Sequence, residues 1–207
     1  MDTATSTALL LGGSYASGVN LYLTAAGLGI AHRLEWLQLP GELETLANPL
    51  IIGIAVLMYI VEFFADKIPY VDSGWDTIHT LIRPLGGAAL GYMALSDAGP
   101  VLQYPVSLLT GAIALESHLT KATARLAINT SPEPVTNSVA SVSEDVGVLG
   151  ALYLIIKHPV VIAIVSIILV IFSIWFLIKM SQLVKKIFSR SKPTPSENMQ
   201  TVNSTKK

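Results

Sequence analysis

Acidic residues inside long apolar segments are the feature that most constrains the fold of this chain. Glu62 and the adjacent pair Glu144 and Asp145 lie in stretches that otherwise resemble membrane-spanning helices. A charged side chain at the centre of a bilayer costs about 2.5–3.5 kcal/mol on insertion scales, so membrane helices turn such residues inward, where they usually mark functional sites. The sequence therefore predicts a membrane protein with an acidic site in its interior.

The composition favours the same class of protein. Apolar residues make up 52% of the chain and charged residues only 13%, whereas about 25% of the residues of a soluble domain are charged. The net charge of −1 gives no reason to expect a nucleic-acid partner, and the lack of cysteine excludes disulfides and thiolate metal sites. The expected partners are the lipid bilayer and a small ion or molecule.

Six membrane-spanning helices are predicted, which makes the fold class all-α and polytopic. The clearest span is the charge-free segment from Pro159 to Ile178, because about 20 apolar residues cross a hydrocarbon core of about 30 Å. Weaker spans precede it at 7–31, 47–66, 77–96, 105–127 and 136–156. Residues 1–190 are thus expected to form one membrane domain.

Basic residues orient these helices, because lysine and arginine concentrate on the cytoplasmic side of a membrane. Lys179, Lys185, Lys186 and Arg190 follow the last span, so the C-terminus is expected in the cytoplasm. Six spans put the N-terminus there too. Residues 191–207, rich in Ser, Thr, Pro, Asn and Lys, are predicted to be a disordered cytoplasmic tail.

Short internal matches suggest two inverted three-helix repeats, 1–97 and 98–190. Gly13-x-x-Ala16 resembles Gly111-x-x-Ala114, and Asn48-Pro49 ahead of Glu62 resembles Ser131-Pro132 ahead of Asp145. Transporters built from inverted repeats bind their cargo where the halves meet. The matches are few, so chance similarity stays an equal alternative.

Candidate ion ligands follow from the acidic clusters. Hard divalent cations prefer oxygen ligands, which makes Glu62, Glu144 and Asp145 the candidate metal or ion ligands, assisted by Asn20 and Ser17 in the Gly- and Ser-rich centre of the first span. Further polar residues are candidates for proton relay or charge pairing, namely Glu116, His118, Asp66, His79, Arg83, Lys121 and Arg125.

A purely structural interpretation competes with the functional one. Glu62 with Arg83, or Glu144 with Lys121, could form internal ion pairs that hold the helices together. Such pairs add little net stability relative to apolar packing, so function is favoured for the acidic clusters. For Asp66, Lys67, Asp72 and Asp76 the structural interpretation is favoured, because they are expected in the solvated membrane interface.

The leading hypothesis is a transporter that moves a small cation, divalent and proton-coupled in its most specific form, through a buried carboxylate site. One alternative is an anion or lipid-phosphate carrier that uses Arg83, Lys121 and Arg125 near the inner leaflet. A second is a non-transporting scaffold, including a homo-oligomer. No zinc-protease, nucleophile-elbow or phosphate-loop motif is present, so no enzyme activity is predicted.

Several strings resemble a known family of small bacterial membrane proteins, the domain of unknown function 4126 family. They are GVNLY at 18–22, EFFADKIP at 62–69, DSGWDTIH at 72–79, and SPEP at 131–134 followed by Glu144 and Asp145. The resemblance covers nearly all of the chain before the tail. It implies a multi-pass protein of a bacterial inner membrane and brings no activity or site residues with it.

Overall fold

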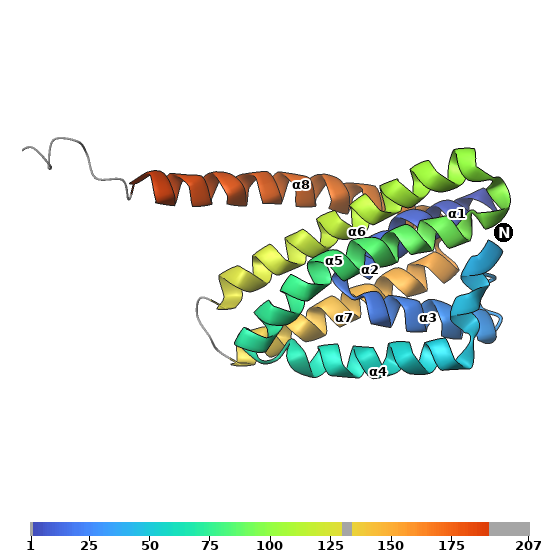
Figure 1. Ribbon diagram of the computed structural model, residues 1–207, viewed down its shortest axis with the longest axis horizontal. Helices are drawn as coiled ribbons and strands as arrows, with labels where there is room; N and C mark the ends of the chain where they lie inside the picture. Colours follow the sequence, from blue (N-terminus) through green and yellow to red (C-terminus); the bar gives the residue numbers. More distant parts are fainter. Residues whose placement is uncertain (1, 130–133, 191–207) are drawn as a thin grey trace, which may run out of the picture.

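The computed structural model describes residues 2–129 and 134–190, which form an all-α bundle of eight helices (Figure 1). Five long helices run alternately in opposite directions, and each begins with a proline. They are α4 (Pro49–Ala65), α5 (Pro69–Ala94), α6 (Pro100–Asn129), α7 (Pro134–Lys157) and α8 (Pro159–Arg190). Proline suits the first helical position because its fixed φ matches the helix and its missing N–H has no helical partner there.

The N-terminal segment is a helical hairpin and not a single crossing. Its first arm comprises α1 (Thr3–Ala8), a π-helical turn η1 (Leu9–Gly13) and α2 (Ser14–Val19), and its second arm is α3 (Leu21–Arg33). Asn20 between them has extended backbone angles, φ −147° and ψ 100°, and its side chain accepts the Leu23 N–H at 2.9 Å, which caps α3.

The two arms of the hairpin point toward the same end of the bundle (Figure 1). Gly12 on the first arm packs against Ile155 of α7, and Gly27 on the second packs against Leu152, one turn away on the same helix. The expectation of one span over 7–31 is therefore wrong, because the chain turns back at Asn20.

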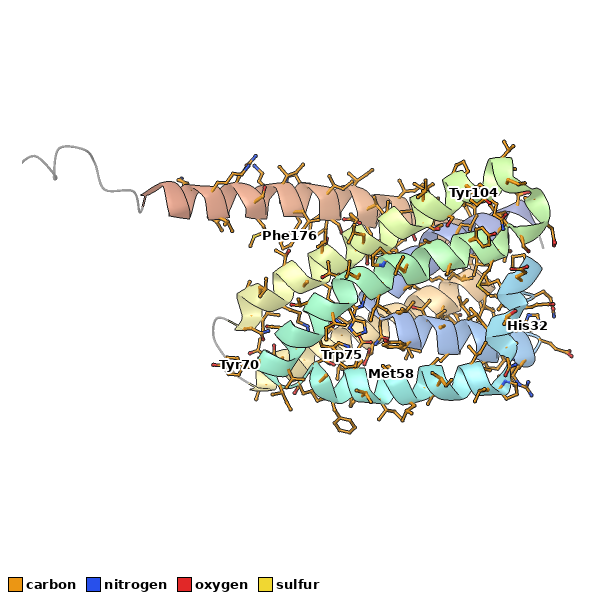
Figure 2. The ribbon with its side chains drawn as sticks, in the orientation of Figure 1. His32, Met58, Tyr70, Trp75, Tyr104 and Phe176 are labelled. Atoms are coloured by element: carbon orange, nitrogen blue, oxygen red, sulfur yellow. The ribbon has the colours of Figure 1, made fainter. Side chains whose placement is uncertain are left out.

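This hairpin changes the relation between the two ends of the chain. His32, near the end of α3, and Tyr70, at the start of α5, mark opposite ends of the bundle (Figure 2). The start of α1 lies at the His32 end, whereas α8 runs toward the Tyr70 end and projects beyond it (Figure 1). The start of α1 and the end of α8 were both expected on the cytoplasmic side, but they lie at opposite ends of the bundle.

Within the described residues, two helices are long and apolar enough to cross a membrane, Val135–Lys157 and Pro159–Lys186. A third span is added if α4 is joined to the 3-10 helix η2 (Gly41–Ala47), from which it is bent by 68°. Helices α5 and α6 are longer than α4, with 26 and 30 residues, but each carries three charged side chains and several polar ones. Six spans and two repeats are not shown, and the predicted tail lies outside the described residues.

Close packing of small residues joins the first arm, α5 and α6. Gly87 and Gly91 of α5 face Thr110 of α6, and Gly18 lies against the backbone carbonyl of Ala114. Small residues at such crossings let helix backbones approach closely, which is the usual source of helix association in membranes.

Replacing Gly18 by valine should destabilise the protein, because a Cβ there would lie 2.3 Å from the Ala114 carbonyl oxygen. Overpacking of this kind costs about 1–3 kcal/mol or more. We expect the apparent melting temperature of the purified protein in detergent to fall by several degrees. Gly53→Val is the matched control, because nothing lies within 4 Å of a Cβ at that position; equal losses in both variants would contradict the packing.

Candidate functional site

The charged side chains of four helices meet inside the bundle. Residues four apart lie on one face of a helix, so Glu62 and Asp66 of α4 face inward together, as do Lys121 and Arg125 of α6. Arg83 of α5 reaches them from the opposite wall. All five are buried.

Arg83 ties the hairpin to the centre of the bundle. Its fully buried guanidinium pairs with Glu62 and donates to the Gly18 carbonyl oxygen at 2.9 Å. It also lies 2.9 Å from Nδ1 of His118, which must be the acceptor because an arginine has no acceptor atom. His118 therefore carries its proton on Nε2, which lies 3.0 Å from the hydroxyl of Thr80.

Lys121 brings the two predicted acidic clusters together. Its ammonium lies 3.4 Å from Oε1 of Glu62, 3.1 Å from Oδ2 of Asp66 and 3.4 Å from Oε2 of Glu144. Helices α4, α6 and α7 therefore share one positive charge. The two ion pairs of the structural interpretation, Glu62 with Arg83 and Glu144 with Lys121, are both present.

Arg125 completes the set of enclosed bases. It holds Glu144 with two parallel hydrogen bonds, from Nε to Oε1 at 2.9 Å and from Nη2 to Oε2 at 2.7 Å. The same guanidinium contacts Oδ2 of Asp66 at 3.3 Å and the Asn137 carbonyl oxygen at 3.1 Å. Paired bonds of this geometry are the strongest that arginine makes to a carboxylate.

Among the described residues, the buried Asp72 and Asp145 form no ion pair, and Asp76 forms only a long one with Arg83. Asp145 accepts hydrogen bonds from Asn20 and from the Tyr59 hydroxyl, both at 3.1 Å. Asp72 accepts from the Asn129 amide at 2.8 Å. The carboxyl oxygens of Asp76 have no hydrogen-bond partner, and Oδ1 lies 3.9 Å from Nη2 of Arg83.

Carboxyl groups therefore outnumber the enclosed bases in this network. The buried carboxyl groups are Glu62, Asp66, Asp72, Asp76 and Asp145, and the buried bases are Arg83, Lys121 and Arg125. Two half-buried groups of opposite charge, Glu144 and Lys67, lie at the edge, where Lys67 donates to the Phe63 carbonyl oxygen at 2.9 Å. With every group ionised the network would carry two uncompensated negative charges, which an apolar interior opposes strongly.

Other predicted site residues lie apart from these ion pairs. Ser17 donates to the Ser14 carbonyl oxygen at 2.8 Å within the first arm. Glu116 faces α8, where it interacts with Ser173. His79 lies 3.0 Å from the Tyr22 hydroxyl and stacks on Trp75.

Asp66, Asp72 and Asp76 correct the expectation that they are solvated, because only 3%, 0% and 5% of their surfaces are exposed, whereas Lys67 is half-buried. The third predicted span started at 77, whereas α5 starts at Pro69 and carries Asp72 and Asp76 into the bundle. These two residues lie eleven and seven residues before Arg83, which is the helical spacing that could have placed them on its face.

No group of three or more His, Asp or Glu side chains within the described ranges is arranged to hold a metal ion. Glu62 and Glu144 contact the ammonium of Lys121, whereas Asp145 faces Asn20 and Tyr59. The three predicted metal ligands therefore do not meet at one point in the described part of the chain.

Removing one partner of a buried ion pair should lower the stability of the folded protein more than removing both partners does. Arg125→Gln leaves the Glu144 charge without its bidentate partner, and such uncompensated burial costs about 3–5 kcal/mol. We expect a large fall in melting temperature for Arg125→Gln and partial recovery in Arg125→Gln/Glu144→Gln. A double variant that loses the sum of the two single losses would show that the pair is not coupled.

The comparisons with known proteins agree with the resemblance of the motifs. The family model described as "Domain of unknown function (DUF4126)" matches residues 7–179, a range that includes the hairpin and the whole charge network. Searches of curated proteins and of solved structures gave no match. The chain belongs to the family defined by this domain of unknown function.

Proposed function

We propose that the protein moves a small cation across a bacterial inner membrane through the buried carboxyl network. The observation that carries this proposal is the excess of two buried carboxyl groups over buried bases among the described residues. In a low-dielectric interior the excess is neutralised by bound cations or protons. Transport follows if these charges exchange with each side of the membrane in turn.

The broken first segment supports a transport role. Non-helical backbone at membrane depth is tolerated where it is buried in protein or lines a polar cavity, and transporters place binding sites at such breaks. Here Asn20 at the tip of the hairpin donates to Asp145, a carboxyl group whose described partners are neutral. Movement of either hairpin arm would change the surroundings of that carboxyl group.

In the proposed topology α4 to α8 cross the membrane five times and the hairpin enters and leaves on one side. The basic residues that follow Ile178 place the end of α8 in the cytoplasm. The start of α1 lies at the opposite end of the bundle (Figure 1), so the N-terminus would face the periplasm.

The anion-carrier alternative is less favoured by this geometry. Arg83, Lys121 and Arg125 are each in contact with at least one carboxylate. A phosphate would have to displace these partners and would leave them buried and unpaired. The cation proposal requires no such displacement.

Single cysteines should report the side on which each helix end lies, because the natural chain has none. In intact spheroplasts a membrane-impermeant maleimide should label Thr3→Cys and leave Ser181→Cys unlabelled until the cells are lysed. Glu42→Cys, in the exposed η2 segment, is the positive control for labelling from outside. Protection of Thr3→Cys alongside Ser181→Cys would restore the six-span topology with both termini inside.

Asp145→Asn should abolish transport without unfolding the protein. The change removes a charge but leaves no base unpaired, since the partners of Asp145 are the Asn20 amide and the Tyr59 hydroxyl. We expect uptake of Na⁺, K⁺, Mn²⁺ or H⁺ into proteoliposomes, whichever the wild type carries, to fall roughly tenfold or more, a loss equivalent to about 1.4 kcal/mol.

The exposed Glu44→Gln variant is the matched control and should retain full uptake. Wild-type uptake no faster than that of empty liposomes for all four ions would refute the proposal and favour the scaffold. Uptake unchanged in Asp145→Asn would remove this carboxyl group from the route.

A further inference from the structure

We propose that the cavity beside Asp76, between α5 and α6, binds a small monovalent cation of the Na⁺ class. The inference deepens the proposed function by naming a binding position at the cytoplasmic end of the route. A measurement of cation binding to the purified protein tests the inference, independently of any measurement of transport.

The cavity has a volume of about 230 Å³ and lies between the N-terminal half of α5 and the C-terminal half of α6. Its polar wall is formed by Ser73, Asp76, Thr77 and Thr80 on one face of α5 and by Thr123 of α6. Asp76 follows Pro69 by seven residues, which places it about 10 Å along the helix at 1.5 Å per residue. The cavity therefore lies within reach of the cytoplasmic end of the bundle.

Asp76 is the group in the cavity that is expected to bind a cation. It lines the cavity and only 5% of its surface is exposed. Neither carboxyl oxygen has a hydrogen-bond partner, and the ion pair from Oδ1 to Arg83 is long, at 3.9 Å. A buried carboxylate in this state is costly unless a cation or a proton accompanies it.

The neighbouring hydroxyl groups present oxygen lone pairs to the cavity. The Thr77 hydroxyl donates to the Ser73 carbonyl oxygen at 2.8 Å, and the Thr80 hydroxyl donates to the Asp76 carbonyl oxygen at 2.9 Å. Because both hydroxyl hydrogens are donated to backbone carbonyl oxygens of α5, the two hydroxyl oxygens can only accept on the side of the cavity. A lining of acceptors binds cations and rejects anions.

The charge of the lining favours a monovalent cation over a divalent one. Ca²⁺ takes six to eight oxygen ligands, and Mg²⁺ holds a near-octahedral shell that it dehydrates reluctantly. The cavity offers one carboxylate, and two guanidinium groups lie close, Arg83 beside Asp76 and Arg125 in the wall. Both guanidinium groups repel a bound cation, and they repel a monovalent cation less than a divalent one. Arg125 is itself held by Glu144 and Asp66 and is not available to an anion.

A short chain of contacts connects the cavity to the central network. His118 Nε2 lies 3.1 Å from the Asp76 carbonyl oxygen, and its Nδ1 lies 2.9 Å from Arg83, which pairs with Glu62. A cation bound at Asp76 therefore lies beside the guanidinium that pairs with Glu62, since Oδ1 of Asp76 is 3.9 Å from Nη2 of Arg83.

Trp75 provides a local reporter, because it is adjacent to Asp76 in sequence and its ring stacks on His79 with centroids 4.6 Å apart. In full-length protein in detergent, Trp36→Phe and Trp175→Phe leave Trp75 as the single tryptophan. LiCl, NaCl and KCl are titrated at constant ionic strength with N-methylglucamine chloride as the balancing salt. We expect a saturable change in Trp75 fluorescence and a matching rise in melting temperature, as binding to the folded state requires.

Asp76→Asn should weaken the apparent affinity roughly tenfold or more, equivalent to about 1.4 kcal/mol, and Thr77→Val should weaken it severalfold. Glu44→Gln is the control, because Glu44 is an exposed carboxyl group outside the network and the cavity; it should bind as the wild type does. Monodisperse elution of every variant establishes that each is folded.

Four results would overturn the inference. They are the absence of any saturable change in either signal, a response to pH alone, an affinity unchanged in Asp76→Asn, or tighter binding of Mg²⁺ or Ca²⁺ than of Na⁺. Binding that depends on Asp76 without uptake into proteoliposomes would support the site and reject the transport proposal. Uptake that depends on Asp145 without binding at Asp76 would do the reverse.

Discussion

The ammonium of Lys121 is the interaction on which the rest of the structure depends. One positive charge lies within 3.4 Å of carboxylates from α4 and α7, and it is carried by α6. A buried charge is tolerated only while its partners stay in place. Three helices are therefore held in one relative position by electrostatics, while the small residues of α5 and α6 hold another crossing by close packing.

The sequence predicted the long helices well because their signals are local. Prolines at 49, 100, 134 and 159 start four of the five helices near the predicted positions. The convergence of Glu62 and Glu144 was also anticipated, since apolar surroundings force charged side chains toward the interior. Their shared partner could not be deduced, because the meeting of Lys121 with both acids depends on how three helices pack.

The hairpin and the burial of Asp72 and Asp76 were not predicted, for two different physical reasons. Residues 7–31 are apolar enough for one span, and the weak helix formers near Gly18 are equally consistent with helix packing. Only tertiary contacts decide whether the chain continues or turns at Asn20. Asp72 and Asp76 were placed in the interface because the polar start of α5 lowers its apparent hydrophobicity. Both residues lie on the face of α5 that packs inside the bundle, so hydropathy averaged over the helix was the wrong guide for them.

Asn20 performs two tasks with the two ends of one amide. Its oxygen caps the second arm of the hairpin, and its nitrogen donates to Asp145. Aspartate could accept the same backbone N–H but could not donate, and it would set a second anion against the first. Glutamine has the same polar atoms on a side chain one methylene longer, which moves both out of register. The bend in the backbone and the chemical state of a distant carboxyl group are thereby linked through a single planar group, whose rotation would release both at once.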